Sequence, residues 1–410
     1  MLKNKFISLV VVMVLLIAVT SITLANSSAK MIGLGDNFVT VTGADALYGN
    51  PAAVNANADV FTLELGTDMK IWNNLLKNDY ISSAEKKDLL SSIKGEGFFV
   101  GVTGRNGAKL IIGPVATSLD LKAEGVVRFN PDIARLVLQG NKIGKTYQFD
   151  DSTGSGAIYA DGAVNLSVTG PEDIWDVEDL YIGFTYHQLA GTIFKVTGTG
   201  DLKVDYAADG GPKATSNGQF TVKYNPMETA SDMAMGSALD FGTYARLNDT
   251  YTVGFSVMNI GAMTADSTRY IKYKYNYDSQ TTDKTLQKTE EGRSTQDLKW
   301  RLPATYRVGG QMSYSEDITF FTDYSYTTYY TGEESYQDHQ IAAATQLTWL
   351  SFLPLRTGLN YSTLENDFDW SAGLGLYLGP LQADLGVSDL TGLFNQTKDL
   401  RSGLTFKIEF

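Results

Sequence analysis

The sequence predicts an all-β protein, a transmembrane antiparallel β-barrel of about 14 strands. Three observations predict it: apolar and polar residues that alternate with a period of two, an export signal, and short connections that alternate with long ones. The last stretch, 402–410, is the clearest strand, with Leu404, Phe406, Ile408 and Phe410 on its apolar side. One such strand also suits a soluble sandwich, whereas a series of them behind an export signal indicates a barrel in lipid.

The composition fits an exported β-protein. The chain has 410 residues, a formal charge of -13, no Cys, and 40 Gly and 23 Tyr against nine Pro, which favours strands and turns over helices. Its length would allow two domains, but large barrels also run this long as one unit. The acidic balance argues against nucleic acid as a partner, and an exported chain without Cys has no disulfides.

Residues 1–25 are expected to be a signal peptide, and the barrel is therefore expected in the cell outer membrane. Lys3 and Lys5 precede an apolar run over 6–19, and small residues before Asn26 offer a cleavage site. This run is shorter than the roughly 20 residues of a spanning helix. No later apolar run reaches that length, so a closed sheet is the remaining way to cross lipid.

Residues 26–59 are rich in small side chains and lack a strand period. They contain Met31-Ile32-Gly33-Leu34-Gly35 and then Asp45-Ala46-Leu47-Tyr48-Gly49-Asn50-Pro51-Ala52. This opening resembles the amino-terminal signature of the FadL-like barrel superfamily, which includes long-chain fatty-acid transporters and the PorV-type barrels of a secretion system. The family usually carries Gly after Asn-Pro-Ala, where this chain has Ala53.

The resemblance implies that this segment folds into the lumen as a plug and that a ligand binds near it. The ligand or plug candidates are then Gly33, Gly35, Asp45, Tyr48, Asn50 and Pro51. Asn50 and Pro51 would fix the turn of the plug, and Asp45 would bond to the barrel wall. The alternative is a simple Gly/Asn/Pro turn region before the first strand, in which Asn50-Pro51 only sets a tight turn.

Two stretches inside the expected barrel, 60–410, are predicted to be helical. Ser82 and Glu85 form a capping box that opens an amphipathic helix, expected to cap a loop by packing on it. A second short helical insertion is predicted over 130–145. The sequences of 72–90 and 138–144 are similar to those of an uncharacterised outer-membrane family of diderm Firmicutes. This resemblance brings no established activity.

The remaining stretches alternate as strands, and their connections fall into two sets. Short connections are expected at 105–107, where Asn-Gly signals a hairpin, and at 247–249, 315–317, 350–354 and 379–380, with a longer one at 169–178. Long connections are expected at 70–95, 130–145, 200–233 and 261–302. Short periplasmic turns alternating with long external loops are typical of an outer-membrane barrel, and an even strand count places both termini in the periplasm.

The polar faces of the strands are expected to line the lumen. The lumen-facing candidates are Asp240, Arg246, Arg307, Asp323, Arg356 and Asp369. Because both signs occur, a lumen of paired charges around a plug is favoured over a wide pore of one sign. No catalytic constellation stands out: His187 and His339 lack metal-ligand spacing, and no nucleophile motif is present. We therefore expect no enzyme activity, no metal and no cofactor.

Three functions remain open at this stage. The first is passive transport of a hydrophobic or amphipathic small molecule, because the plug signature implies a ligand near it. The second is a structural or assembly barrel that docks a secreted or surface-layer partner through its long external loops, as PorV-like relatives imply. The third is a soluble secreted β-protein, which would need no membrane lipid around it.

Overall fold

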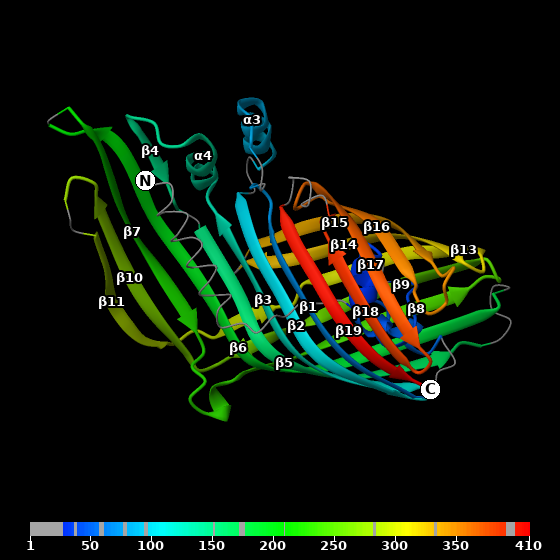
Figure 1. Ribbon diagram of the computed structural model, residues 1–410. Helices are drawn as coiled ribbons and strands as arrows, with labels where there is room; N and C mark the ends of the chain where they lie inside the picture. Colours follow the sequence, from blue (N-terminus) through cyan, green and yellow to red (C-terminus); the bar gives the residue numbers. More distant parts are fainter. Residues whose placement is uncertain are drawn as a thin grey trace.

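The structure is a computed structural model that describes residues 28–36, 39–56, 61–76, 80–93, 97–150, 152–171, 177–208, 210–281, 284–331, 334–390 and 398–410. The predicted signal peptide and its cleavage site lie outside these residues. The chain forms a closed antiparallel β-barrel with a segment of the chain inside it (Figure 1).

Fourteen strands make the barrel wall, which confirms the predicted count. The sheet closes because the first strand pairs with the last, from Thr62 opposite Glu409 to Trp72 opposite Asp399. In order around the wall the strands are β1 (Phe61–Asn73), β2 (Phe98–Ile112), β3 (Val115–Phe129), β5 (Ser152–Thr169), β6 (Asp179–Tyr206), β8 (Ala234–Arg246), β9 (Tyr251–Ala265), β13 (Ala304–Ser315), β14 (Ile318–Thr331), β15 (Glu334–Leu347), β16 (Leu355–Ser362), β17 (Asp367–Leu378), β18 (Leu381–Ser388) and β19 (Asp399–Glu409).

The period of two sorts the side chains between the outside and the inside of the barrel. Exposed apolar residues cover the outer face on strand after strand, among them Leu65, Leu121, Leu166, Phe184, Leu239, Leu359, Leu376 and Phe406. Their neighbours in the sequence are largely buried and polar. An apolar outside around a polar inside is the arrangement of a barrel in lipid, and it excludes the soluble β-protein.

Both chain ends of the barrel lie at one rim, where Phe61 and Phe410 exchange backbone hydrogen bonds. The same rim carries the short connections, so we call it the periplasmic rim and the opposite one the external rim. The predicted hairpin at 105–107 is wrong, because β2 runs straight through it. The turn lies instead at Gly113-Pro114, where Gly113 has a φ of 56°.

The external rim carries helices and a second layer of strands. The predicted capping box opens α3 (Ser83–Ser92), where Ser82 and Glu85 bond reciprocally. The second predicted helix is α4 (Pro131–Gln139), and it is followed by β4 (Lys145–Gln148). Side chains next to α3, including Leu75 and Ile93, pack with Ile133 and Leu138 of α4. In the described part of the chain no helix is long and apolar enough to cross a membrane.

Two of the predicted long loops form a sheet that extends beyond the barrel, which we call the extension sheet (Figure 1). Residues 179–191 of β6 pair with the barrel strand β8, whereas residues 194–206 continue outward and pair with β7. The extension sheet comprises β4, the outer half of β6, β7 (Pro212–Tyr224), β10 (Thr268–Asp278) and β11 (Lys284–Ser294). The short β12 (Leu298–Arg301) pairs with β9 above the end of β13.

The amino-terminal segment lies inside the barrel, as the resemblance implied. It contains α2 (Ala29–Gly33), η1 (Gly43–Tyr48) and η2 (Pro51–Asn55), and nearly all of its described residues are buried. The α2 helix contacts β16 to β19, while η2 contacts β5, β6 and β8 on the other side. The segment therefore spans the lumen from wall to wall, and we call residues 28–56 the plug.

Candidate functional site in the barrel lumen

Glycines of the wall let the plug backbone come into direct contact with the barrel. A Cβ built on Gly183 would lie 2.2 Å from the carbonyl carbon of Pro51, and one on Gly386 would lie 2.1 Å from the carbonyl oxygen of Ala29. On the plug side, a Cβ on Gly33 would lie 2.6 Å from the Cα of Gly373. Only glycine fits such close backbone contacts, so these residues hold the plug in one position.

Asn50 and Pro51 join the plug to two parts of the wall. The Asn50 side chain is fully buried; its Nδ2 donates to the carbonyl oxygens of Val39 (2.7 Å) and Thr243 (3.0 Å), and its Oδ1 caps η2 by accepting from Ala52 N (3.1 Å). The carbonyl oxygen of Pro51 accepts from Asn165 Nδ2 at 3.1 Å. The Asn-Pro pair is thus both the turn of the plug and a point of attachment.

Tyr48 and Asp45 meet the charged side of the lumen. The Tyr48 ring centroid lies 3.5 Å from Cζ of Arg105 and 3.4 Å from Nζ of Lys109, and its hydroxyl donates to Asp120 Oδ1 at 3.1 Å. Two cations at an aromatic face, both removed from water, make a strong contact. Asp45 is buried, accepts a hydrogen bond from Ser28 within the plug, and feels the charges of Lys109 and Lys407 from the wall.

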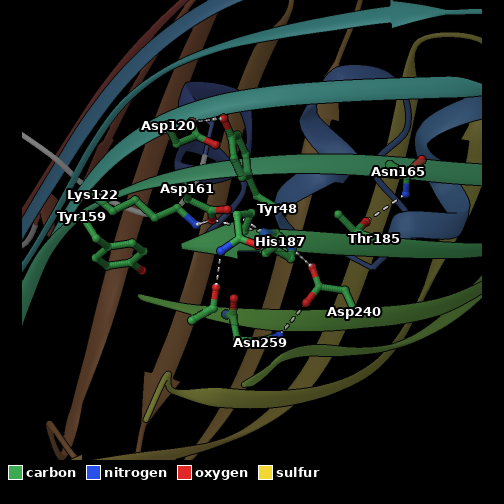
Figure 2. A network of polar contacts seen from close by, with 12 residues as sticks. Tyr48, Asp120, Lys122, Tyr159, Asp161, Asn165, Thr185, His187, Asp240 and Asn259 are labelled. Carbon is green, nitrogen blue, oxygen red and sulfur yellow. Dashed lines mark hydrogen bonds and ion pairs between the residues drawn. The ribbon is translucent and has the colours of Figure 1, made fainter. Parts of the chain in front are cut away.

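A band of paired charges crosses five neighbouring wall strands above the plug (Figure 2). His187 lies between two carboxylates, with Nδ1 2.9 Å from Asp161 and Nε2 2.9 Å from Asp240. Asp161 also accepts from Lys122 Nζ at 2.7 Å, and Asp240 from the backbone N–H of Asn259 at 2.6 Å. Both nitrogens of His187 therefore face a carboxylate, and a protonated imidazole satisfies Asp161 and Asp240 at the same time.

A cluster of buried apolar side chains lies on the external side of this band, and we call it the apolar wall. It faces the lumen, because Tyr159 shares a strand face with Asp161, and Leu189 and Ile193 share one with His187. The residues are all buried: Ala157, Tyr159, Leu189, Ile193, Ala234, Ala238, Met263, Ala265, Leu298, Trp300 and Leu302. These side chains pack against one another and form an apolar layer, in contrast to the charged band next to it.

Strands that are not neighbours contact one another across the external half of the lumen. The rings of Tyr159 and Trp300 are 5.4 Å apart, and those of Phe99 and Tyr336 are 4.6 Å apart in an edge-on arrangement. Ser155 Oγ donates to the carbonyl oxygen of Tyr330 at 3.1 Å. Between the external and periplasmic rims the lumen thus holds three layers in sequence: this contact layer with the apolar wall, the charged band, and the plug.

Five of the six predicted lumen-facing residues lie inside the barrel. Asp240, Asp323, Arg356 and Asp369 are buried, and Arg307 is largely so. Arg356 pairs with Asp384 and also donates to the hydroxyl of Tyr377. Arg246 is different: it lies at the periplasmic rim with an exposed side chain and pairs with Glu178 and Asp179. Arg246 occupies an inner-face position in the alternation of β8, but the strand ends at this residue, so its side chain reaches solvent.

The sequence pattern missed His187 and the wall glycines as parts of the site. His187 alternates with exposed residues such as Tyr186 and so belongs to the inner face, although neither metal-ligand spacing nor a nucleophile motif gives it a role in the sequence. The wall glycines carry a similar signal. Gly183 and Gly242 occupy inner-face positions, where polar side chains would be expected in a lumen of paired charges, so glycine there indicates a close backbone contact. The apolar wall carries no such signal, since its residues come from five separate strands.

Comparisons with known proteins identify the fold. No protein-family model matches the chain, and no curated protein matches it in sequence. Among solved structures, the Pseudomonas putida toluene transporter TodX matches with a TM-score of 0.56 and 12% identity over 94% of this chain and 99% of TodX. The Ralstonia pickettii toluene transporter TbuX matches with a TM-score of 0.54 and 11% identity over 94% and 99%.

A third structure agrees with these two. CymD, described as a monoaromatic hydrocarbon channel, matches with a TM-score of 0.54 and 12% identity over 95% of this chain and 99% of its own. All three are channels or transporters rather than enzymes. At such low identity the likeness concerns the fold alone, and the chain shares the barrel fold of these three proteins.

Proposed function

We propose that the protein is an outer-membrane channel for passive transport of hydrophobic or amphipathic small molecules. The observation that carries the proposal is the apolar wall in the lumen, between the external contact layer and the charged band. A charged lumen alone suits ions or water, whereas buried Leu189, Ile193 and Trp300 offer a hydrophobic molecule a place to leave water. The shared fold with toluene transporters supports the same reading.

In this proposal the plug is the second barrier. A molecule on the apolar wall meets the charged band and then the plug, which Asn50 and Pro51 attach to the barrel strands through Thr243 and Asn165. Passage therefore needs the plug to move or to loosen. We keep the predicted ligand role of four plug residues as part of this proposal: Gly33, Gly35, Asp45 and Tyr48. The signal peptide and the likeness to the outer-membrane family of diderm Firmicutes also remain proposals.

Uptake of labelled toluene by intact cells tests the proposal. The outer membrane of the cells must carry the protein, because a plain phospholipid vesicle is itself permeable to toluene. We expect uptake above that of cells without the protein, and a changed rate when Asn50-Pro51 is replaced by Ala-Ala. Equal uptake with and without the protein, or an unchanged rate in a folded Ala-Ala variant, would contradict the proposal.

The extension sheet supports a second candidate, docking of a secreted or surface-layer protein. Among the described residues its outer strand β11 has a printed register with β10 alone, and an open edge can pair with a strand of another chain. Deleting 280–293 removes most of this edge and leaves the barrel wall intact. Docking predicts that a co-purifying polypeptide is lost while toluene uptake stays the same; a partner retained by the deletion variant would rule out this edge.

A further inference from the structure

Three carboxylates from separate elements meet in the lumen near the external rim. Glu365 comes from the connection between β16 and β17, Asp369 from β17 and Asp399 from the start of β19. They are 5%, 7% and 3% exposed, and one oxygen of each lies within 4.8 Å of those of the other two. Among the described residues this is the one group of three possible metal ligands so arranged.

Too little positive charge faces these carboxylates. Lys70 of β1 pairs with Glu365 (2.5 Å) and with Asp399 (3.1 Å). The nearby Lys398 donates to the backbone carbonyl oxygens of Glu365 and Asn366, and lies 3.5 Å from Asp367. One ammonium against three buried carboxylates leaves two negative charges, and burying unbalanced charge is costly.

Other charges around the group do not remove this excess. Arg401 pairs with Asp36 of the plug and also acts on Asp399 by its charge, so it offsets the three carboxylates only in part. Asp389 adds a further negative charge close enough to act on both Asp369 and Asp399. The local excess of negative charge therefore calls for a cation that the protein does not supply.

Asp369 is the second, independent sign of a ligand. It is only 7% exposed, and its side chain makes no hydrogen bond and no direct ion pair within the described chain, although its carboxylate lies close to those of Glu365 and Asp399. Both oxygens of Asp399 are buried; Lys70 Nζ lies 3.1 Å from Oδ2, whereas Oδ1 has no partner among the described residues and can accept a further ligand. Buried carboxylate oxygens are normally satisfied, so these two side chains have coordination to offer.

We propose that Glu365, Asp369 and Asp399 bind one Ca²⁺ ion at the external end of the lumen. Oxygens bound to the same Ca²⁺ at 2.3–2.6 Å lie at most about 5 Å apart, which the 4.8 Å limit satisfies. Ca²⁺ accepts six to eight oxygens in flexible geometry, so water from the mouth completes the shell. The ion joins β17 and β19 to the β16–β17 connection and displaces Lys70 from the centre of the group.

Calcium titration of the full chain in detergent, followed by calorimetry, tests the site. We expect one ion per chain with a Kd of about 10⁻⁴ to 10⁻³ M, the range of extracellular calcium modules. Asp369→Asn and Asp399→Asn should weaken binding by about tenfold or more, since even indirect ligand partners contribute that much. Lys70→Gln should bind more tightly, because the competing ammonium is gone.

The thermal unfolding midpoint gives a second readout. The difference in midpoint between the wild type and Asp369→Asn should have opposite signs in chelator and in calcium. In chelator, Asp369→Asn should melt at or above the wild-type temperature, because it removes an unbalanced charge. In calcium, the wild type should gain stability by mass action, and Asp369→Asn should not. Asp317→Asn, an exposed residue in the β13–β14 turn, is the matched control and should behave as wild type in both.

Two results would overturn the proposal. One is the absence of calcium binding up to about ten times the expected range of Kd, which would mean that the carboxylates share protons instead. The other is equal binding by the wild type, Asp369→Asn and Asp399→Asn, which would place the ion elsewhere on the protein. Uptake of toluene is not part of this test, so the calcium site and the transport function stand or fall separately.

Discussion

At the scale of single residues, His187 is the centre of the charged band. Replacing it with Leu removes the one cation between Asp161 and Asp240, while Lys122 remains on Asp161 alone. Breaking a buried ion pair by removing one partner costs about 3–5 kcal/mol. We expect a loss of that size in the free energy of unfolding of His187→Leu, measured with denaturant in detergent or lipid.

His339, the other histidine of the chain, provides the control. It is exposed on β15 and shares a hydrogen bond with the hydroxyl of Tyr324 at 2.8 Å. His339→Leu should change the free energy of unfolding by less than about 0.5 kcal/mol, as exposed substitutions do. If both histidine variants unfold alike, His187 does not hold the band together.

The sequence predicted which charged residues turn inward but not how they pair. Strand parity alone identified Asp240, Asp323, Arg356 and Asp369 as lumen residues. Which residue each of these side chains pairs with depends on the stagger between strands and on the position of the plug. A local sequence pattern predicts neither. For the same reason the group of Glu365, Asp369 and Asp399 gave no metal-ligand spacing in the sequence.

At the scale of elements, the β2–β3 turn shows where a local signal failed. Asn106-Gly107 has the form of a hairpin, yet Gly107 lies in the middle of β2 opposite Asp120. A Cβ on Gly107 would come within 1.7 Å of an Asp120 oxygen. Glycine leaves room at this position for the Asp120 carboxylate, which Arg105 and Tyr48 contact. A rule based on turn residues cannot predict this contact, because it considers only neighbours in the sequence.

Insertion of a short epitope tag distinguishes the two positions. Between Gly113 and Pro114 it should be tolerated, because this is an exposed two-residue turn at the periplasmic rim. Between Asn106 and Gly107 a tag with an odd number of residues would shift every later residue of β2 in register and turn its lumen side chains outward. Heat-modifiable migration on a gel reports the folded barrel; a folded barrel with the tag at 106–107 would contradict the register of β2.

At the scale of the whole molecule, the predicted barrel of about 14 strands and its lumen segment are confirmed, but the outline was incomplete. The stretches 200–233 and 261–302 were expected as long polar loops, and they pair into the extension sheet. Their polarity follows from their place beyond the membrane, where both faces of a sheet meet water. A polar strand without one apolar face has no period that distinguishes it from a loop.

We propose that hydrophobic molecules enter through the external half of the lumen, between strands that contact one another across it. A reversible thiol-reactive linker between Phe99→Cys and Tyr336→Cys tests it, because these facing rings belong to strands that are not neighbours and the chain has no other Cys. Ser118→Cys with Ala163→Cys, opposite each other on the neighbouring strands β3 and β5, is the control that links the wall without spanning the lumen.

The decisive measurement is toluene uptake by cells carrying each linked pair, before and after reduction of the linker. Our account predicts that the linker across the Phe99→Cys and Tyr336→Cys pair lowers uptake to the level of cells without the protein, that reduction restores it, and that the control pair has no effect. Uptake that continues unchanged with the first pair linked would contradict the account, since the molecule would then cross the membrane without passing between these strands.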